Sequence, residues 1–261
     1  MRKNKPVVSR PRHRRPSGML PFAVLFLVSL SLSVYAVQSL KNLPFFKVKN
    51  VIIREGLAIR DDRDADFQYL IGKNIFTLDL KKHAQFIQSM YPSYRTARLV
   101  RFFPNQLCVD LMKRKAVACI NTQPPLYIDD RMIFFESVDP AAEKGVPAVY
   151  GLDGANKRFR SGARCSHQGL LFAVRVLQAA KKGKVLRGYP IERVDIHDPQ
   201  YVSLFFPGPL EVRIGQDKLE DTLQILGSLL SQVGNGVANI EYIDLRFKDP
   251  VIRFKGKEAE R

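Results

Sequence analysis

An α+β fold with one N-terminal transmembrane helix is what this sequence of 261 residues predicts. Three observations lead to it: an uncharged apolar stretch near the N-terminus, then mixed strand and helix patterns, then short apolar runs separated by turn residues. The sequence therefore divides into a basic tail (1–18), a transmembrane helix (19–40), a compact β-α-α-β-β domain (44–115), a mainly antiparallel β-domain with two helices (116–254) and a C-terminal tail (255–261).

The apolar stretch is long enough to cross a bilayer. Residues 16–40 contain no charged side chain, and a helix over 19–40 is about 30 Å long, the thickness of the hydrocarbon core. Residues 1–15 carry seven Lys or Arg and no acid, and such a tail stays on the cytoplasmic side. The 221 residues from Lys41 onward are then expected outside the cytoplasm.

A cleaved signal peptide is the competing interpretation of the same stretch. Val34, Tyr35 and Ala36 have the small-residue spacing that a signal peptidase accepts. The apolar segment is longer than a typical signal core, however, and it continues past this site to Leu40. An uncleaved anchor fits the sequence better.

Charge and cysteine content limit the classes of partner. The net charge is +17, and +10 of it belongs to the residues after the anchor, which carry 35 basic and 25 acidic side chains. This excess suits anionic lipid or an acidic partner without choosing between them. Cys108, Cys119 and Cys165 are an odd number without metal-site spacing. We interpret them as small buried residues. A disulfide bond between Cys108 and Cys119 remains an alternative if the domain lies in an oxidising compartment.

The first domain after the anchor combines strand and helix signals. Asp79 can cap a helix in which one face is apolar, namely Leu80, Ala84, Ile87 and Tyr91. A shorter helical segment is expected at 67–71, and strands are expected at 48–53, 95–103 and 107–112. We expect two helices on one face of a three-stranded sheet, with Ile75, Phe76, Leu78 and Leu80 buried.

The second domain is mostly strands. Strands are expected at 116–120, 126–128, 132–135, 191–196, 201–206, 210–214, 240–247 and 251–254. One helix is expected at 169–182, and a second follows a capping box formed by Asp217 and Glu220. A leucine stripe on this second helix has the period of a helix packed on a sheet, and it consists of Leu219, Leu223, Leu226 and Leu230.

No arrangement for catalysis is found in the sequence. His83, His167 and His197 are the only histidines beyond the tail and the anchor, and none has a nucleophile at a useful spacing. Phosphate-binding, dinucleotide-binding, hydrolase and zinc motifs are absent. We expect no catalytic, cofactor-binding or metal-binding residues, no small-molecule substrate and no nucleic-acid partner.

Several strings resemble the FtsQ/DivIB family of bacterial cell-division proteins, whose POTRA domain precedes a β-domain. They occur in the family's order behind one N-terminal anchor, at 72–79 (GKNIFTLD), 101–107 (RFFPNQL), 113–118 (KRKAVA), 126–130 (LYIDD) and 240–247 (IEYIDLRF). Lys113 and Ala116 depart from the family, which often has Glu and Pro there.

The resemblance implies a non-enzymatic scaffold of the division septum in the inner membrane, with a POTRA domain at 44–115 and an FtsQ-type β-domain at 116–254. It implies partners of the FtsB/FtsL type, small coiled-coil membrane proteins, which would bind the C-terminal end of the β-domain and so link early and late division proteins. The expected partner-binding residues are Tyr242, Arg246, Phe247, Val251 and Ile252.

An open sheet edge suits such a partner, because its unpaired backbone groups can take up another strand. The sequence leaves open whether the edge is 242–247 or 251–254, and Pro250 lacks a backbone donor wherever it falls. Two alternatives are a membrane-anchored cell-envelope enzyme and a POTRA-type secretion component. The second would normally carry a C-terminal barrel of alternating strands, which the sequence lacks.

Overall fold

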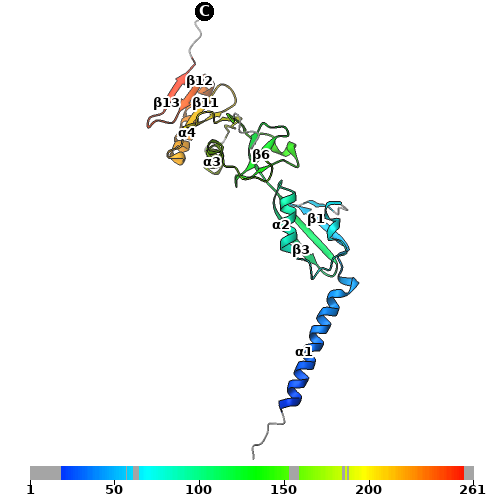
Figure 1. The fold of residues 1–261 in the computed structure, drawn as a ribbon. Coiled ribbons are helices and arrows are strands. Elements are labelled where there is room, and N and C mark those ends of the chain that lie inside the picture. Colours follow the sequence, from blue (N-terminus) through cyan, green and yellow to red (C-terminus); the bar gives the residue numbers. More distant parts are fainter. Residues whose placement is uncertain are drawn as a thin grey trace, which may run out of the picture. The chain divides into compact units, whose positions relative to one another are not determined.

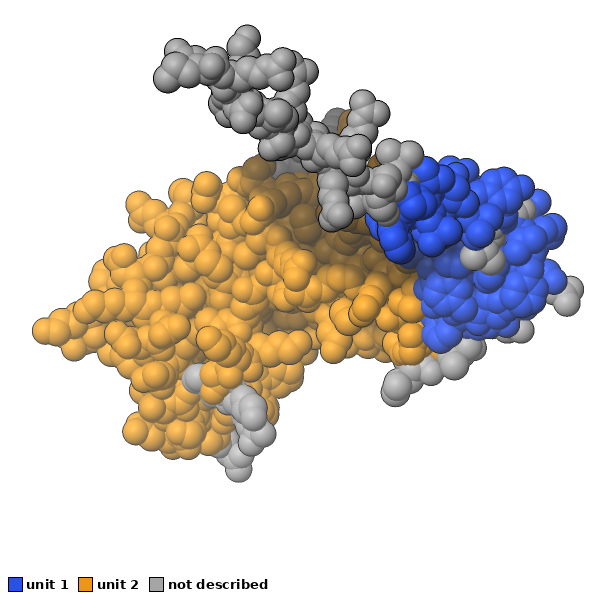
Figure 2. Space-filling model, turned by 90° about the horizontal axis from the view of Figure 1, so that it is seen from below, with its two compact units in different colours: residues 1–52, 62–78, 101–108 blue, residues 53–61, 79–100, 109–261 orange. Residues whose placement is uncertain are grey.

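The computed structural model describes residues 19–56, 58–60, 65–152, 159–183, 186 and 188–255 (Figure 1). The predictions for the basic tail and for most of the C-terminal tail lie outside these residues. The chain divides into two compact units, 1–52 with 62–78 and 101–108, and 53–61 with 79–100 and 109–261 (Figure 2).

The predicted N-terminal helix is confirmed as α1 (Met19–Asn42). Its segment Pro21–Ser39 is long and apolar enough to cross a membrane. Two of its serines satisfy their hydroxyls within the helix, because Ser29 Oγ donates to the Phe26 carbonyl at 3.0 Å and Ser33 Oγ donates to the Ser29 carbonyl at 2.7 Å. A polar group in the hydrocarbon core of a bilayer needs a hydrogen-bond partner within the protein, and these bonds provide one.

The segment after α1 forms a four-stranded sheet in the order β2-β1-β4-β3. Its elements are η1 (Pro44–Phe46), β1 (Asn50–Glu55), β2 (Ala58–Arg60), η2 (Ala65–Leu70), α2 (Leu80–Met90), β3 (Tyr94–Phe102) and β4 (Gln106–Lys113). The expectation of three strands was wrong, because the chain turns back after Gly56, which has a φ of +59°, and adds β2 beside β1. The first predicted helix is a 3₁₀ segment, η2.

The cap and the buried face of α2 are confirmed. Asp79 accepts a hydrogen bond from the Lys82 backbone N–H at 3.1 Å, which satisfies one of the free donors of the first turn. Ile87 is buried, and Leu80, Ala84 and Tyr91 are partly buried. The apolar period of the sequence therefore marks the inner face of this helix.

Phe76 corrects the expected core of this region. Ile75 and Leu78 are buried as expected, whereas Leu80 is only partly buried and Phe76 is 42% exposed. The turn explains the difference: Asn74 Oδ1 accepts from the Phe76 N–H at 2.8 Å, and the Arg101 guanidinium donates to the carbonyls of Ile75 at 2.6 Å and Leu78 at 2.7 Å. These bonds fix the loop backbone with Ile75 and Leu78 inward and Phe76 outward.

The β-domain has a nine-stranded sheet in the order β13-β12-β11-β10-β9-β8-β5-β6-β7. Its strands are β5 (Ala116–Ile120), β6 (Leu126–Asp129), β7 (Phe134–Phe135), β8 (Ala148–Tyr150), β9 (Arg193–Asp195), β10 (Tyr201–Phe205), β11 (Glu211–Gly215), β12 (Ile240–Asp244) and β13 (Val251–Phe254). Among the described residues between these strands lie α3 (Gln168–Gly183), α4 (Leu219–Val233) and the 3₁₀ segments η3 (Pro140–Glu143) and η5 (Gly234–Asn239).

The expected antiparallel pairing holds for most of this sheet. Parallel pairing occurs between β5 and β8, between β8 and β9 and between β11 and β12. β8 was not expected, and two of the three parallel pairs depend on it. The expected strand 240–247 is also too long, since β12 ends at Asp244.

The leucine stripe of α4 is core, as its period indicates. Leu223, Leu226 and Leu230 are buried with residues of α3 and of the sheet in one cluster, and Leu219 packs against it. The expected capping box is wrong: the N-cap is Lys218, which has a φ of +45°, and no side chain caps the helix. Glu220 and Asp221 instead place negative charge in the first turn.

Candidate partner-binding edge of the β-domain

β13 forms one edge of the nine-stranded sheet. It pairs antiparallel with β12, and among the described strands none lies on its other side. Backbone N–H and C=O groups along that outer side have no sheet partner, because an edge strand fills only one of its two ladders. The open edge is therefore 251–254 and not 242–247. Pro250 precedes β13, so its missing donor falls outside the strand.

The side chains of β13 combine exposed and anchored residues. Val251 and Phe254 are exposed, whereas Ile252 is partly buried and packs against the main core. Ile252 therefore holds the strand to the domain. Arg253 Nε lies 3.1 Å from Glu241 Oε2, and both side chains are well exposed. Such a pair contributes little to stability.

Tyr242 belongs to a row of side chains that runs straight across five strands. The sheet register places these residues opposite one another in the order Arg193, Phe205, Glu211, Tyr242 and Arg253. The Arg213 guanidinium lies 4.7 Å from the centre of the Tyr242 ring, and the Arg253 guanidinium lies 5.9 Å from it. Both distances are in the range of cation–π attraction. Tyr242 is thus held in place by its neighbours.

The carboxylate of Glu211 organises the centre of this face. It accepts from Ser203 Oγ at 2.7 Å and takes two hydrogen bonds from Arg213, at 2.9 and 3.1 Å. Burial alone raises the pKa of Glu211, but the hydrogen bonds from Arg213 and Ser203 outweigh it and hold the pKa below its ordinary value. Glu211 is therefore ionised and paired near neutral pH.

Asp244 and Arg246 form a clamp at the end of β12. Arg246 donates from Nε at 2.9 Å to Oδ1 and from Nη2 at 2.6 Å to Oδ2 of Asp244, and its backbone N–H donates at 3.1 Å to Oδ1. Burial raises the pKa of Asp244, and the bonds from Arg246 lower it by more, so the net shift is downward. The Arg246 guanidinium also lies 4.3 Å from the centre of the Tyr201 ring. The sequence offered Arg246 as a partner contact, and in the described chain it fixes the connection from β12 to β13.

Phe247 lies in that connection with 61% of its surface exposed. Its ring centre is 5.5 Å from the Arg246 guanidinium. This exposure shows that Phe247 is not a core residue.

The five residues expected from the sequence thus lie on β12, on β13 and on the connection between them. Sequence reasoning missed four others on the same face or edge, namely Glu211, Arg213, Arg253 and Phe254. The alternation of polar and apolar residues along β11 could have indicated that Glu211 and Arg213 lie on the outer face, since Val212 and Ile214 are apolar and buried. Their pairing with β12 could not be read from the sequence, because it joins segments separated by a helix.

The histidines and cysteines have positions that fit structural roles. His167 Nδ1 accepts from the Leu170 N–H at 3.3 Å, at the start of α3, and the His197 backbone N–H donates to Asp195 Oδ1 at 2.9 Å. The three cysteines are free, so the Cys108–Cys119 bridge is not formed in this structure. Burial raises the pKa of the Cys119 and Cys165 thiols, which disfavours the reactive thiolate. In the described part of the chain, no three His, Cys, Asp or Glu side chains gather where they could hold a metal ion.

Asp129 and Asp130, the adjacent carboxylates at the end of β6, are also structural. Asp129 is fully buried and accepts from the N–H groups of Arg131 at 2.9 Å and Ile133 at 2.8 Å and from Arg114 Nη1 at 2.6 Å. Asp130 pairs with Arg95 at 3.0 Å. These contacts stabilise the turn between β6 and β7.

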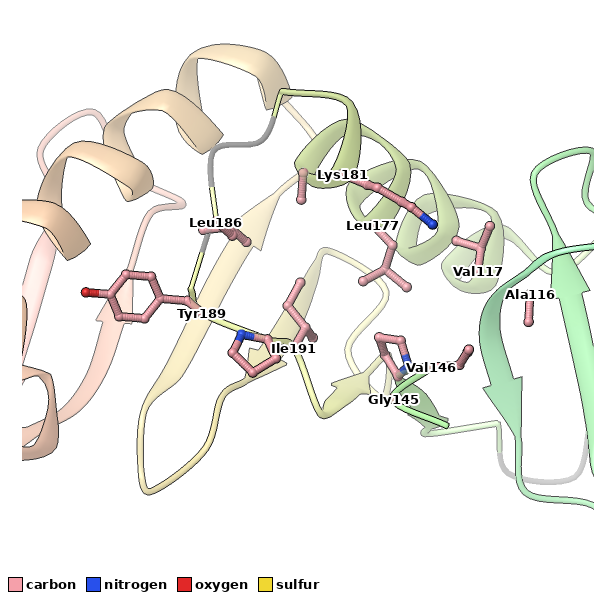
Figure 3. A pocket seen from close by; sticks show the side chains of 12 residues that line it. Ala116, Val117, Gly145, Val146, Leu177, Lys181, Leu186, Tyr189 and Ile191 are labelled. Carbon is pink, nitrogen blue, oxygen red and sulfur yellow. The ribbon is translucent and has the colours of Figure 1, made fainter. Parts of the chain in front are cut away.

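An apolar pocket of about 380 Å³ lies between β5, α3 and the segment that leads into β9 (Figure 3). Among the described residues that line it, only Lys181 and Tyr189 have titratable side chains. The Tyr189 hydroxyl points away from the pocket and donates to the Leu230 carbonyl at 3.0 Å. The described lining therefore offers no carboxylate or imidazole for acid–base catalysis.

The comparisons with known proteins agree with this architecture. The family model "Cell division protein FtsQ/DivIB, C-terminal" matches residues 118–246, from within β5 to just after β12. The chain belongs to the FtsQ/DivIB family of cell-division proteins. Its role in cell division follows from this membership, and α1 fits a single-pass membrane protein of the family.

Three relatives carry the same printed name, cell division protein FtsQ. The protein of Syntrophotalea carbinolica is 24% identical over 229 residues, which are 87% of this chain and 80% of the relative. That of Geobacter sp. strain M21 is 21% identical over 69% of this chain and 65% of its own length. That of Myxococcus fulvus is 24% identical over 62% of this chain and 56% of its own length. The FtsQ/DivIB model ends before Phe247 and β13, so those residues lie outside the matched range.

Proposed function

We propose that the chain is a non-enzymatic scaffold of the division septum, and that its β-domain binds an extended segment of a partner protein along β13. The open outer side of β13 is the observation that carries this proposal. A partner strand would complete the sheet through backbone hydrogen bonds, and exposed side chains beside the edge would give specificity. Phe247, Val251 and Phe254 are the exposed apolar residues there.

The partners proposed are small coiled-coil membrane proteins of the FtsB/FtsL type, through which the chain would link early and late division proteins. Family membership supports this class of partner, and the row of ion pairs and cation–π contacts supports a preformed surface. A preformed edge lowers the ordering cost that binding must offset. The domains proposed for this role are a POTRA domain at 44–115, which would support recruitment, and the partner-binding β-domain at 116–254.

Side-chain truncation at the edge tests this proposal. Phe254→Ala and Val251→Ala should each weaken binding of the partner's periplasmic segment to the full chain in nanodiscs, by roughly five- to thirtyfold if they are hot spots of 1–2 kcal/mol. Their melting temperatures should stay at the parent value, because both side chains are exposed. Val138→Ala is the matched control, an exposed valine after β7 at the opposite edge of the sheet. Parent-like affinity in both edge variants would remove β13 from the binding site.

The orientation proposed for the chain has the N-terminus in the cytoplasm and the two domains outside. Protease added to spheroplasts should digest the domains and leave a small N-terminal fragment, because seven basic residues precede the anchor. A mature protein that starts near Val37 would contradict the anchor. In dividing cells, a fluorescent fusion should concentrate at the septum.

A further inference from the structure

Exposed aromatic residues gather just after the end of α1. Their rings form a continuous chain: Phe45 and Phe46 are 5.2 Å apart between ring centres, Phe46 and Phe76 are 5.0 Å apart, and Phe76 and Phe103 are 5.4 Å apart. Leu43, Phe45, Phe76 and Phe103 are exposed, and Phe46 is partly buried. We call these five residues the juxtamembrane patch. A connected apolar surface of this kind in a folded domain usually marks an interaction site.

The backbone holds this patch close to the anchor. Leu43 and Pro44 alone separate Asn42, the last residue of α1, from Phe45, so the two Cα atoms are at most roughly 11 Å apart. The Ile75 N–H donates to the Phe46 carbonyl at 2.9 Å, and the Lys49 N–H donates to the Asn105 carbonyl at 2.8 Å. These bonds tie the loop of Phe76 and the turn of Phe103 to the chain as it leaves α1. The patch therefore cannot move far from the bilayer surface when α1 crosses the bilayer.

The charges of the same unit suit lipid headgroups. Three lysines of this unit that follow α1 in the described chain are exposed, namely Lys47, Lys49 and Lys73. Aromatic rings favour the boundary between headgroups and acyl chains, and nearby lysines add attraction to anionic lipid.

We propose that the juxtamembrane patch lies in the interfacial layer of the bilayer that α1 crosses. The domain after the anchor then rests on the membrane surface and is not held by a free tether. This interaction surface is separate from the partner edge at β13, and it depends on α1 remaining in the membrane.

The absence of tryptophan from the chain makes a direct test available. Phe103→Trp places one fluorophore in the patch, and Phe254→Trp is a matched control on β13, because both phenylalanines are 61% exposed. The full chain is purified from membranes, checked by intact mass and circular dichroism, and reconstituted in vesicles of phosphatidylcholine and phosphatidylglycerol. Brominated lipid of the same headgroups then serves as a quencher that reports contact with the bilayer.

Phe103→Trp should emit at shorter wavelength than Phe254→Trp and should be quenched several-fold more strongly by brominated lipid. Phe45→Trp is a second reporter, should Phe103→Trp fail to fold, and the same result is expected of it. Removing phosphatidylglycerol should weaken the quenching of the patch without abolishing it. Equal, water-like emission and equal quenching in the patch and control variants would overturn the proposal, as would a mature chain that lacks α1.

Discussion

Replacing Arg246 by alanine should destabilise the β-domain and loosen β13. Asp244 has only 6% of its side chain exposed and receives two of its hydrogen bonds from the Arg246 guanidinium. Removing a donor to a buried charge costs about 1.5–3 kcal/mol. The lower part of this range applies here because the Arg246 side chain is 30% exposed, so that water can replace some of the hydrogen bonds that the guanidinium donates. The lost contact with Tyr201 adds about 0.5–1 kcal/mol. The expected total is about 2–3 kcal/mol.

Thermal unfolding of the full chain in detergent measures this loss. For a domain of this size, 2–3 kcal/mol corresponds to a fall of roughly 5 to 10 °C in melting temperature. Hydrogen exchange should also become faster in β12 and β13, because the clamp fixes the connection between them. Arg246→Lys should recover only part of the loss, since an ammonium group cannot donate to both carboxylate oxygens in the geometry of a guanidinium.

Arg253→Ala is the matched control for Arg246→Ala. Arg253 is also an arginine at this end of the sheet with a carboxylate partner, but its side chain is 62% exposed and that of Glu241 is 48% exposed. Its loss should cost no more than about 1 kcal/mol. If the two variants melt at the same temperature, the argument that burial of Asp244 makes Arg246 structural is wrong.

Two further predictions concern the core and the pH dependence of stability. Ile75→Ala should cost about 2–5 kcal/mol and Phe76→Ala much less, because Ile75 is fully buried and Phe76 is not; chemical denaturation of both variants compares them, and equal losses would contradict this assignment. The pKa values of Glu211 and Asp244 are lowered in the folded chain. The two carboxylates therefore stabilise the folded state fully above their unfolded pKa values of about 4, and this stabilisation is lost as the pH falls further. Unfolding measured between pH 7 and pH 3 should show a flat region and then a decline, and replacing both by their amides should flatten that decline.

Local patterns in the sequence were sufficient to locate the four α-helices of the described chain, α1 to α4. The cap at Asp79 and the buried leucines of α4 follow from spacing within one element, and local spacing is visible in one sequence. The capping box at Asp217 fitted its motif equally well and was wrong, since Lys218 occupies the cap. A capping motif indicates which residues could cap a helix. The backbone conformation just before the helix determines which residue occupies the cap position.

The parts that the sequence did not predict depend on contacts between distant segments. β8 has only three residues, between Pro147 and Gly151, and its place between β5 and β9 comes from parallel pairing across long connections. The outward position of Phe76 depends on hydrogen bonds from Asn74 and Arg101. At the candidate site, the sequence indicated the correct terminal segment. The sequence could not distinguish Arg246, whose guanidinium binds Asp244, from Phe247 and Val251, which are exposed.

Hydrogen exchange of the β13 backbone, with and without the partner, tests the proposed function most directly. Strand addition would give new partners to the outward N–H groups of 251–254, which no described strand engages in the free chain. The full chain in nanodiscs should therefore show slower exchange in this segment when a partner of the FtsB/FtsL type is bound, while the pocket beside α3 stays unchanged. Binding that leaves exchange in 251–254 at its free rate would contradict an edge-strand mechanism.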